Sequence, residues 1–569
     1  MDLRARAERW AAEDPDPATR DEVTALLAAG DEAALAERFG ARLEFGTAGL
    51  RGALGAGPAR MNRAVVRQVS AGLAARLLQE PGAATRGVVV GRDARHKSDE
   101  FAEDAARVLA AAGLAVRRFP GVVPTPLVAF AVRHLDAAAG VQITASHNPP
   151  ADNGYKVYWS GGAQIVAPLD REISAAIDAV GSVGAIPLAP LDDPRIGLVP
   201  AAVREHYVAA LLDLQLHPEA RDLRIVYTPL HGVAGEVVGH VLGRAGFDDV
   251  AVVREQADPD PDFPTVAFPN PEEPGALDRA FALAAERDAD LVLANDPDGD
   301  RVAAALPEAG GWRALTGDEI GCLLADYLLS EGPQDDGRVV ATTVVSSQLL
   351  GRIAAAHGAE CVETLTGFKW LAPVAADAER RGRRFVMAYE QALGAMVGTA
   401  VRDKDGISAA LVLAELAAWE KSRGRTLRDR LDDLARRFGL HATAGRALRL
   451  EGPTGQQQIA ATLARLRAAP PEEIGGVAVA AVADHEAGTR RWRDGREEPL
   501  TTPPTPLLGY TLADGSRLQL RPSGTEPLLK LYLEVVEPVA DGEPVSAARG
   551  RAEQRLAALG DAFLALARG

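Results

Sequence analysis

Short apolar runs and amphipathic stretches alternate along the first half of the chain. The run GVVVGRD at 87–93 predicts a strand and turn, and AGVQI at 139–143 predicts a short buried strand. Between them, FAEDAARVLAAAGL at 101–114 has the spacing of an amphipathic helix that ends at Gly113. Residues 1–40 have a helical Ala/Leu/Glu/Arg composition. This alternation is typical of a mixed or parallel α/β domain.

The same alternation returns twice further along the chain. Strands that end in loops are predicted at 223–235 and 289–301, and later at 338–347 and 383–394, with a helix at 316–330. No repeat is visible in the residues themselves, so only the pattern of elements recurs. We expect a second and a third α/β unit of similar build.

The last part of the chain has a different pattern. Asp514-Gly515 lies between two strand-like runs within 508–537, which predicts a hairpin, and 545–567 predicts a closing helix. A proline-rich stretch at 185–200 marks a domain boundary. We therefore predict an α/β protein of three similar mixed α/β domains and a smaller C-terminal α+β domain around a central cleft. The predicted boundaries are 1–197, 198–312, 313–440 and 441–569.

Composition narrows the class of protein. The 569 residues are 47% hydrophobic and carry a formal net charge of −17, which argues against nucleic acid or an anionic membrane as partner. The two cysteines, Cys322 and Cys361, suggest neither a disulfide framework nor a zinc site, and we expect both to be small buried residues. The N-terminal residues have no apolar signal region, so a cytoplasmic location is expected.

A serine lies on a loop directly after a predicted strand, in TASHNPPADNGYKVY at 144–158. Pro149 and Pro150 prevent a helix from starting there, so Ser146 should lie on a loop that leaves the strand end. In open α/β sheets, chemistry is usually done at that edge. A helix cap or turn is the alternative for an isolated serine. The adjacent His147 does not by itself indicate a serine hydrolase, because no G-x-S-x-G elbow surrounds Ser146.

An acidic loop, NDPDGDR at 295–301, follows another predicted strand. Its carboxylates Asp296, Asp298 and Asp300 alternate, and three anions held together favour a bound Mg²⁺ or Ca²⁺. An EF-hand is excluded, because its Gly and Glu positions hold Arg301 and Pro307. Taken alone, the loop fits a metal site and an acidic turn equally well.

Other loops carry groups that suit a phosphate or a sugar. FGTAGLRG at 45–52 offers backbone amides and one arginine, and RPSGTEP at 521–527 offers an arginine, two hydroxyls and a glycine, with Lys530 beyond. Glu390 ends a predicted strand, where it can accept hydrogen bonds from hydroxyls. TGFKW at 366–370 is expected to place Lys369 in a tight turn, and VRDKDG at 401–406 adds Lys404. Together these loops predict a phosphorylated, hydroxyl-rich substrate.

The chain resembles the α-D-phosphohexomutase superfamily of phosphoglucomutases and phosphomannomutases. Four motifs carry the resemblance and follow one another in the order found in that superfamily: TASHNP, DPDGDR, E-x-x-x-G and RPSGTEP. The resemblance covers nearly the whole chain. FGTAGLRGALGAGPARMN and TGFKW are more similar to the branch of phosphoglucomutase 2 and the phosphopentomutases. One departure is the sugar loop, where Ala392 stands at a position that is serine in many relatives, which puts the choice of hexose in doubt.

The resemblance implies a role for each matching residue. Ser146 would be a phosphoserine that also contacts Mg²⁺ held by the three aspartates. The other groups near the transferring phosphoryl group would be Arg51, His147, Lys156 and Lys369. The substrate would be bound by Arg301, Gly367, Glu390, Ala392, Lys404, Arg521, Ser523, Gly524 and Thr525.

The activity that the resemblance implies is the interconversion of glucose 1-phosphate and glucose 6-phosphate, with glucose 1,6-bisphosphate as activator and intermediate. Phosphopentomutase and phosphomannomutase activities are the near alternatives, followed by glucose 1,6-bisphosphate synthesis and a non-catalytic sugar-phosphate binder. A phosphatase with an aspartate nucleophile would give no role to RPSGTEP. A monomer or weak dimer is expected.

Overall fold

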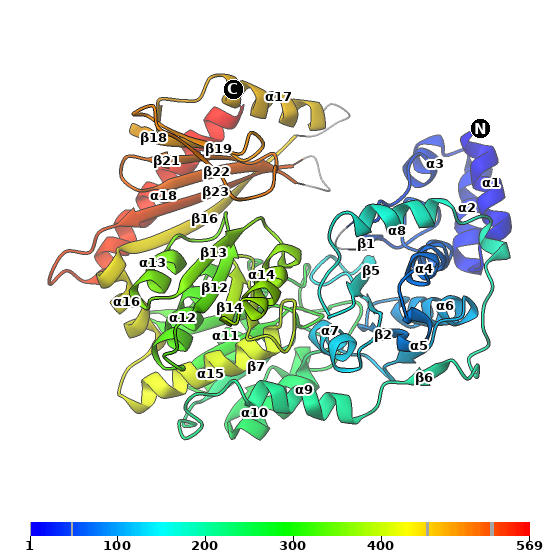
Figure 1. The fold of residues 1–569 in the computed structure, drawn as a ribbon, viewed down its shortest axis with the longest axis horizontal. Coiled ribbons are helices and arrows are strands. Elements are labelled where there is room, and N and C mark those ends of the chain that lie inside the picture. The colour runs from blue at the N-terminus through cyan, green and yellow to red at the C-terminus, as the bar shows by residue number, and fades with distance from the viewer. Residues whose placement is uncertain (1, 47–48, 451–454, 524–527, 569) are drawn as a thin grey trace. The chain divides into compact units, whose positions relative to one another are not determined.

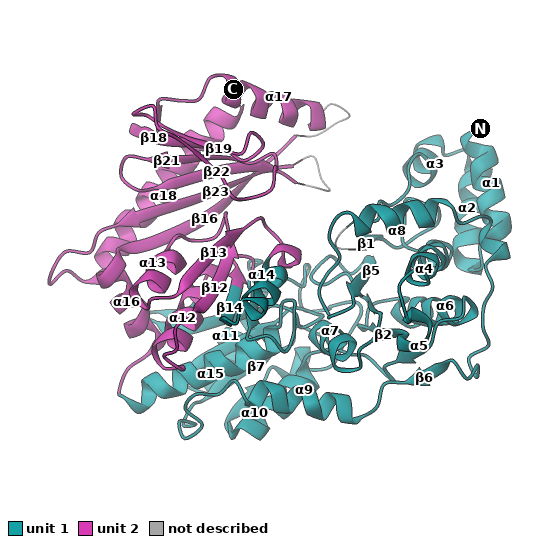
Figure 2. Cartoon of the chain, in the orientation of Figure 1, with its two compact units in different colours: residues 1–315, 371–388, 393–423 teal, residues 316–370, 389–392, 424–569 magenta. Residues whose placement is uncertain are grey.

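The computed structural model of the protein describes residues 2–46, 49–450, 455–523 and 528–568. These residues form two compact units (Figures 1 and 2). Unit 1 consists of residues 1–315, 371–388 and 393–423, and unit 2 of residues 316–370, 389–392 and 424–569. Among the described residues, no helix combines the length and the apolar character needed to cross a bilayer.

Three helices build the N-terminal segment of unit 1, whose composition predicts helix. They are α1 (Leu3–Glu13), α2 (Pro17–Ala29) and α3 (Glu32–Phe39). The breaks follow local chemistry. Pro17 takes the first helical position of α2, where its missing N–H costs nothing. Gly30 then ends α2 in the left-handed conformation with φ 63°, and Asp31 caps α3.

The first α/β sheet of unit 1 has the order β1-β5-β4-β2-β3-β6. Strands β2, β3, β4 and β6 are parallel, while β5 is antiparallel to both β4 and β1. The predicted strand at 139–143 is confirmed as β4. The strands are β1 (Leu50–Ala53), β2 (Val88–Arg92), β3 (Val116–Arg118), β4 (Ala139–Ile143), β5 (Asp152–Trp159) and β6 (Ile196–Leu198). The helices of this region are α4 (Arg63–Leu77), α5 (Ala83–Arg86), α6 (Ser98–Ala111), α7 (Thr125–His134) and α8 (Leu169–Asp178), with a 3₁₀ turn at Val183–Ala185.

The second sheet of unit 1 has the order β11-β10-β9-β7-β8. Strands β7, β8 and β9 are parallel, and β10 returns antiparallel to β9, so one tight loop joins these two strands. The strands are β7 (Ile225–Thr228), β8 (Val250–Val252), β9 (Leu291–Asn295), β10 (Val302–Glu308) and β11 (Gly311–Ala314). The helices are α9 (Ala202–Leu212), α10 (Gly235–Ala245) and α11 (Asp278–Glu286), with a 3₁₀ turn at Arg254–Gln256.

The third sheet has the order β13-β12-β14-β15. Its strands are β12 (Arg338–Thr343), β13 (Glu360–Thr364), β14 (Arg384–Glu390) and β15 (Gly394–Val397). The helices are α12 (Gly317–Ser330), α13 (Leu349–Ala356), α14 (Phe368–Arg380), α15 (Gly406–Ser422) and α16 (Leu427–Phe438). A capping box formed by Thr316 and Glu319 starts α12.

A larger antiparallel sheet of eight strands belongs to unit 2 and has the order β16-β23-β22-β21-β18-β19-β20, with β17 paired to β18. The predicted hairpin is confirmed. Strands β21 and β22 pair antiparallel around Gly515, which has φ 85°. The strands are β16 (Leu440–Arg449), β17 (Glu473–Ile474), β18 (Val477–Asp484), β19 (Thr489–Trp492), β20 (Glu497–Pro499), β21 (Leu508–Leu512), β22 (Arg517–Pro522) and β23 (Leu528–Glu537). The helices are α17 (Gly455–Ala468) and α18 (Val545–Arg568).

Candidate active site

Ser146 lies on the loop between β4 and β5, as the two prolines predicted. Its backbone is in the left-handed region with φ 53°, which is uncommon for a residue other than glycine and costs free energy. The Ser146 N–H donates to Thr144 Oγ1 at 2.9 Å, which helps to hold this turn. The strained turn places the serine side chain at the carboxyl end of a buried strand.

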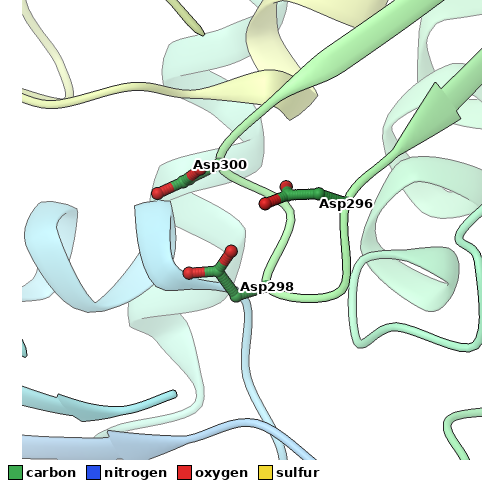
Figure 3. A group of neighbouring side chains, drawn as sticks. All are labelled: Asp296, Asp298 and Asp300. Carbon is green, nitrogen blue, oxygen red and sulfur yellow. The ribbon is translucent and has the colours of Figure 1, made fainter. Parts of the chain in front are cut away.

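The acidic loop joins β9 to β10 and carries three fully buried carboxylates (Figure 3). Asp296, Asp298 and Asp300 each offer an oxygen, and these oxygens lie within 4.8 Å of one another. The turn needs glycine at position 299, because φ there is 72° and a Cβ would come within 2.9 Å of Ala234 Cβ. The alternate spacing seen in the sequence therefore gathers the carboxylates on one loop.

Ser146 reaches this cluster across 150 positions of sequence. Its Oγ donates to Asp296 Oδ2 at 2.8 Å and lies 3.3 Å from His147 Nδ1. Burial, together with the positive charges of Arg301 and Arg51, lowers the pKa of His147, so its ring is neutral. The serine hydroxyl thus lies between a carboxylate and a neutral imidazole.

Two lysines partly neutralise the carboxylates. Lys156, on β5, donates from Nζ to Asp298 Oδ2 at 2.6 Å and to Asp300 Oδ2 at 2.9 Å. Lys404 Nζ lies 3.3 Å from Asp300 Oδ2, so this residue, expected to bind substrate, contacts the acidic cluster. Burial opposes ionisation of Asp298, but the charge and hydrogen bond of Lys156 outweigh it and lower its pKa. Burial and the two neighbouring anions raise the pKa of Asp296.

The sequence reasoning missed Thr125, which opens α7. Its Oγ1 donates to Asp298 Oδ2 at 2.5 Å, and its N–H donates to the Asp298 carbonyl at 2.9 Å. The only signal in the sequence was the pair of prolines on either side of Thr125, which is compatible with a helix start.

The cluster fits a hard divalent cation. Within the described residues, Asp298 Oδ1 and Asp300 Oδ1 are buried and have no hydrogen-bond partner. Buried carboxylate oxygens rarely stay unpartnered, and carboxylate oxygens are the donors that such cations prefer. Lys156 contacts the other oxygen of both side chains, and Lys404 contacts that of Asp300. In the part of the chain that the structure describes, the two Oδ1 atoms are left without a hydrogen bond, with Arg301 Nε 3.9 Å from that of Asp300, and are available to a metal ion.

Two further cations of unit 1 come from separate elements. Arg51, on β1, pairs in register with Gly154 of β5, and its Nη1 donates to Asn148 Oδ1 at 2.9 Å. Burial lowers the Arg51 pKa, although the charges of Asp298 and Asp300 oppose that effect. Arg301 is the last residue of the acidic loop, and its backbone N–H donates to Asp296 Oδ1 at 3.0 Å. This hydrogen bond joins the two ends of the loop.

Unit 2 carries the predicted sugar loop. Glu390 ends β14, as expected, and is 8% exposed. The next side chain, Gln391, accepts from Ser346 Oγ at 3.0 Å, and Ala392 follows it. The predicted tight turn around Lys369 was wrong. Lys369 lies in the first turn of α14, not in a tight turn, and the turn is made one step earlier by Gly367 with φ 110°.

The predicted phosphate loop begins at the end of the β22–β23 pair in unit 2. Arg521 stands directly opposite Lys530, so two cations share one face of the sheet, an arrangement that is destabilising without an anion. Arg521 Nε donates to Tyr532 Oη at 3.2 Å, and the Ser523 N–H donates to the Leu528 carbonyl at 2.7 Å. The other two predicted residues, Gly524 and Thr525, lie outside the described residues.

Both cysteines are free thiols. Cys322 is buried, as expected, whereas Cys361 is only partly buried. Burial raises the pKa of each thiol, to about 12 for Cys361. Neither thiol is therefore a candidate nucleophile.

Family models match four successive segments of the chain. Residues 42–183, 205–310 and 316–438 match alpha/beta/alpha domains I, II and III of phosphoglucomutase/phosphomannomutase, and residues 463–545 match the C-terminal domain. The predicted class of three α/β domains and a C-terminal domain is therefore confirmed. The boundaries predicted from the sequence stay a prediction.

Individual proteins agree with the family models. The chain is 41% identical to a probable phosphomannomutase of Haemophilus influenzae over 83% of this chain and 93% of that protein. It is 39% identical to a probable phosphoribomutase of Schizosaccharomyces pombe over 93% of each. A putative phosphomannomutase from Thermus thermophilus has the same fold, with a TM-score of 0.67 at 24% identity over 93% of this chain and 100% of that one.

The identity with these relatives extends over nearly all of the chain, and the acidic cluster and serine loop described above lie within the matched segments. The chain therefore belongs to the phosphoglucomutase/phosphomannomutase family of the α-D-phosphohexomutase superfamily and is an enzyme of the phosphosugar mutase type.

Proposed function

We propose that the protein interconverts glucose 1-phosphate and glucose 6-phosphate through a phosphoserine at Ser146 and a bisphosphate intermediate. The observation that carries the proposal is the 2.8 Å hydrogen bond from Ser146 Oγ to Asp296 Oδ2, within a cluster of three buried aspartates. A serine hydroxyl is a weak nucleophile at neutral pH, but a phosphoserine holds the phosphoryl group ready for transfer.

Mg²⁺ is the cofactor that we assign to Asp296, Asp298 and Asp300. Their two open carboxylate oxygens support this assignment, and a site of few protein ligands suits an ion that keeps other oxygens around it. When bound, Mg²⁺ supplies positive charge that offsets the charge on the phosphoryl oxygens.

Transfer breaks the bond between Ser146 Oγ and phosphorus and forms a bond from phosphorus to a sugar hydroxyl oxygen. The hydroxyl proton passes to a base of the site, and the resemblance favours Lys369 for this step. Arg51 on β1 contacts Asn148 of the serine loop, Lys156 on β5 contacts the aspartate cluster, and the neutral His147 lies beside Ser146. We assign to these three residues the orientation of the phosphoryl group. The departing Ser146 Oγ takes up one proton in place of the phosphoryl group, which balances the proton that the sugar hydroxyl loses. The products of this half-reaction are a sugar bisphosphate and a free Ser146 hydroxyl.

The second half-reaction needs the bisphosphate to bind in the opposite orientation and return its other phosphoryl group to Ser146. Throughout, the phosphate that does not react would be held by Arg521, Ser523, Gly524 and Thr525. The facing cations Arg521 and Lys530 support an anion site there. Glu390 would accept hydrogen bonds from sugar hydroxyls.

A second candidate is the same reaction on pentose phosphates, from ribose 1-phosphate to ribose 5-phosphate. Ala392 favours it, because alanine lacks a hydroxyl at a position where many hexose enzymes have serine. The 39% identity with a probable phosphoribomutase points the same way. Phosphomannomutase activity, glucose 1,6-bisphosphate synthesis and a binding role without catalysis are the other outcomes to be tested.

The experiment is a coupled assay with Mg²⁺ and trace glucose 1,6-bisphosphate. Glucose 1-phosphate, mannose 1-phosphate and ribose 1-phosphate are compared for the wild type, Ser146→Ala and a control variant, Ser174→Ala, on α8. We expect glucose 1-phosphate to turn over, with activity lost in Ser146→Ala and kept in the control. Preference for ribose 1-phosphate would identify pentose phosphates as the substrates and leave the reaction itself unchanged. Equal activity in Ser146→Ala would overturn the phosphoserine.

A further inference from the structure

A buried arginine beside the serine loop has no role in the function proposed above. Arg95 follows β2 and is 3% exposed. Its Nη1 donates to the carbonyls of Pro149 at 2.7 Å and Asp152 at 3.1 Å, and its Nη2 to those of Ser146 at 2.7 Å and Asn148 at 2.6 Å. One guanidinium therefore binds four carbonyls within a segment of seven residues.

The number of contacts matches the donor capacity of the group. The two terminal nitrogens of a guanidinium carry four N–H bonds in a fixed plane, and here each nitrogen donates to two carbonyls. A lysine ammonium has three donors and no fixed plane, so it cannot reproduce this set. The contact also needs a definite loop shape, because four carbonyls must converge on one plane.

Asp93 holds the guanidinium from its other side. Asp93 Oδ2 lies 3.4 Å from Arg95 Nε, while Oδ1 accepts from the Arg95 N–H at 3.0 Å and from Ser98 Oγ at 2.7 Å. The ring of Phe263 covers the guanidinium at 5.0 Å. Both members of the pair are buried, so the position of Arg95 is fixed before any ligand binds.

The serine loop needs such a restraint. Ser146 is held at φ 53°, a conformation that persists only where its surroundings enforce it. Arg95 donates to the carbonyl of this same residue, and the other three carbonyls follow within six residues. We propose that Arg95, held by Asp93, is a positioning residue that fixes the Ser146 loop so that Ser146 Oγ meets Asp296. The catalytic part of this role rests on the proposed function.

The test compares Arg95→Lys with Arg338→Lys as a matched control. Arg338 is also buried, at 6% exposed, and donates to the Leu329 carbonyl at 2.8 Å and to the His357 carbonyl, but in unit 2. Asp93→Asn is a milder second variant, because it keeps an oxygen acceptor and removes only the charge. For each variant we measure kcat, KM and the melting temperature at saturating glucose 1,6-bisphosphate.

We expect Arg95→Lys to lower kcat about 100-fold while KM stays within about threefold, because a displaced reacting group slows transfer without weakening substrate binding. Asp93→Asn should lower kcat about tenfold with the same unchanged KM. Arg338→Lys should lower the melting temperature and leave kcat unchanged. An unchanged kcat in folded Arg95→Lys, or in Asp93→Asn if Arg95→Lys does not fold, would overturn the proposal.

A second readout separates this proposal from the proposed function. Hydrogen exchange of residues 144–154 is measured in Ser146→Ala with and without Arg95→Lys, where no phosphoserine can form. We expect faster exchange of this segment in the double variant, whatever the substrate of the enzyme. Equal exchange would show that Arg95 does not restrain the loop, while turnover by Ser146→Ala would reject only the phosphoserine.

Discussion

Each unit of the protein contains a group of buried carboxylates, and the oxygens of the two groups are satisfied in different ways. In unit 1 the group is the three aspartates, and in unit 2 it is Glu534 and Asp318, which share Ser347 as a donor and, with their donors, are called the Glu534 cluster. In unit 2, Glu534 Oε1 accepts from Ser347 Oγ at 2.6 Å, from the Gln348 N–H at 2.9 Å and from His441 Nδ1 at 2.8 Å. Glu534 Oε2 accepts from Gln348 Nε2 at 3.0 Å and pairs with Arg517 at 3.2 Å. Both carboxylate oxygens of Glu534 are thus bound by protein donors.

In unit 1, the aspartate cluster keeps two oxygens open. Lys156 and Thr125 bind one oxygen of Asp298, and the lysines bind one oxygen of Asp300, but the Oδ1 atom of each has no hydrogen-bond partner within the described chain. The orphaned atom of the Glu534 cluster is instead a ring nitrogen, His441 Nε2, which cannot compete with a carboxylate for a hard cation.

Burial and negative charge therefore do not by themselves mark a metal site. Glu534 is 3% exposed and Asp298 is 0% exposed, so exposure does not distinguish them. What distinguishes them is whether the protein supplies a donor for every carboxylate oxygen. We assign a structural role to the Glu534 cluster and a metal to the aspartate cluster.

Removal of divalent cations should have the largest effect on mutase activity, and it tests whether the aspartate cluster needs a metal. We expect EDTA to abolish mutase activity and added Mg²⁺ to restore it, since the carboxylates alone repel an incoming phosphoryl group. The fold should survive, because Lys156 and Lys404 already neutralise part of the charge. Circular dichroism and activity measured on the same sample check this. Full activity in excess EDTA would argue against the metal.

Asp298→Asn should act nearly as strongly. The amide keeps the shape but supplies a nitrogen and no charge, so we expect kcat to fall about 1,000-fold and Mg²⁺ affinity to fall with it. Asp104→Asn is a matched control, because Asp104 is also a fully buried aspartate of unit 1 but pairs with Arg63 and Arg67. Kinetics at several Mg²⁺ concentrations measure both quantities. Wild-type Mg²⁺ dependence in Asp298→Asn would remove this residue from the site.

Glu534→Gln should lower the stability of the protein and leave its Mg²⁺ affinity unchanged. Loss of Glu534 leaves Arg517 with the more distant and more exposed Glu363, at 3.7 Å, as its acidic neighbour. We expect the free energy of unfolding to fall by about 3 kcal/mol. Mg²⁺ affinity, measured by calorimetry, should stay at the wild-type value. A variant that lost Mg²⁺ binding but kept its stability would reverse the roles assigned to the two clusters.

The smallest expected effect is a pH dependence of stability in unit 2. Burial raises the pKa of Asp318 from 3.8 to about 6, and Glu534 adds to the rise. The folded form therefore binds more protons than the unfolded form between these values, so the contribution of Asp318 to stability is lost as pH rises towards 6. Urea unfolding of wild type and Asp318→Asn from acid to neutral pH should differ by about 1–2 kcal/mol across this window.

The pKa of Glu534 is shifted in the opposite direction, so Glu534 affects stability at lower pH. Burial opposes its ionisation, but Arg517 and the hydrogen bonds of His441 and Ser347 outweigh burial and lower its pKa from 4.5 to about 2. Its contribution is present above 4.5 and is lost as pH falls towards 2. In the same titration, Glu534→Gln should remove this acid loss, and persistence of the loss in that variant would assign it to another group.

The sequence predicted those parts of the fold and site that depend on local chemistry. Asp514-Gly515 gave the hairpin, Pro149 and Pro150 gave the serine loop, and the alternate aspartates gave the carboxylate cluster. The contact of Ser146 with Asp296 was reached only through the family resemblance, because no local rule joins residues 150 positions apart.

The missed or wrong features depend on tertiary contacts or weak signals. Arg95 and Thr125 both donate hydrogen bonds to backbone carbonyls. Every residue has a backbone carbonyl, so the sequence does not show which carbonyl a donor will bind. TGFKW at 366–370 predicts a tight turn at Lys369, yet α14 begins at Phe368, directly after Gly367. The helical composition of residues 1–40 concealed breaks at Pro17 and Gly30.

The most direct test of the phosphoserine is a transfer experiment on the protein itself. The purified enzyme is incubated with Mg²⁺ and glucose 1,6-bisphosphate, its phosphorylated residue is located by peptide mass spectrometry, and glucose 1-phosphate or ribose 1-phosphate is then added. We expect one phosphoryl group on Ser146, lost to the sugar phosphate on addition, and none in Ser146→Ala. Turnover by an enzyme that never carries phosphate on Ser146 would contradict this expectation.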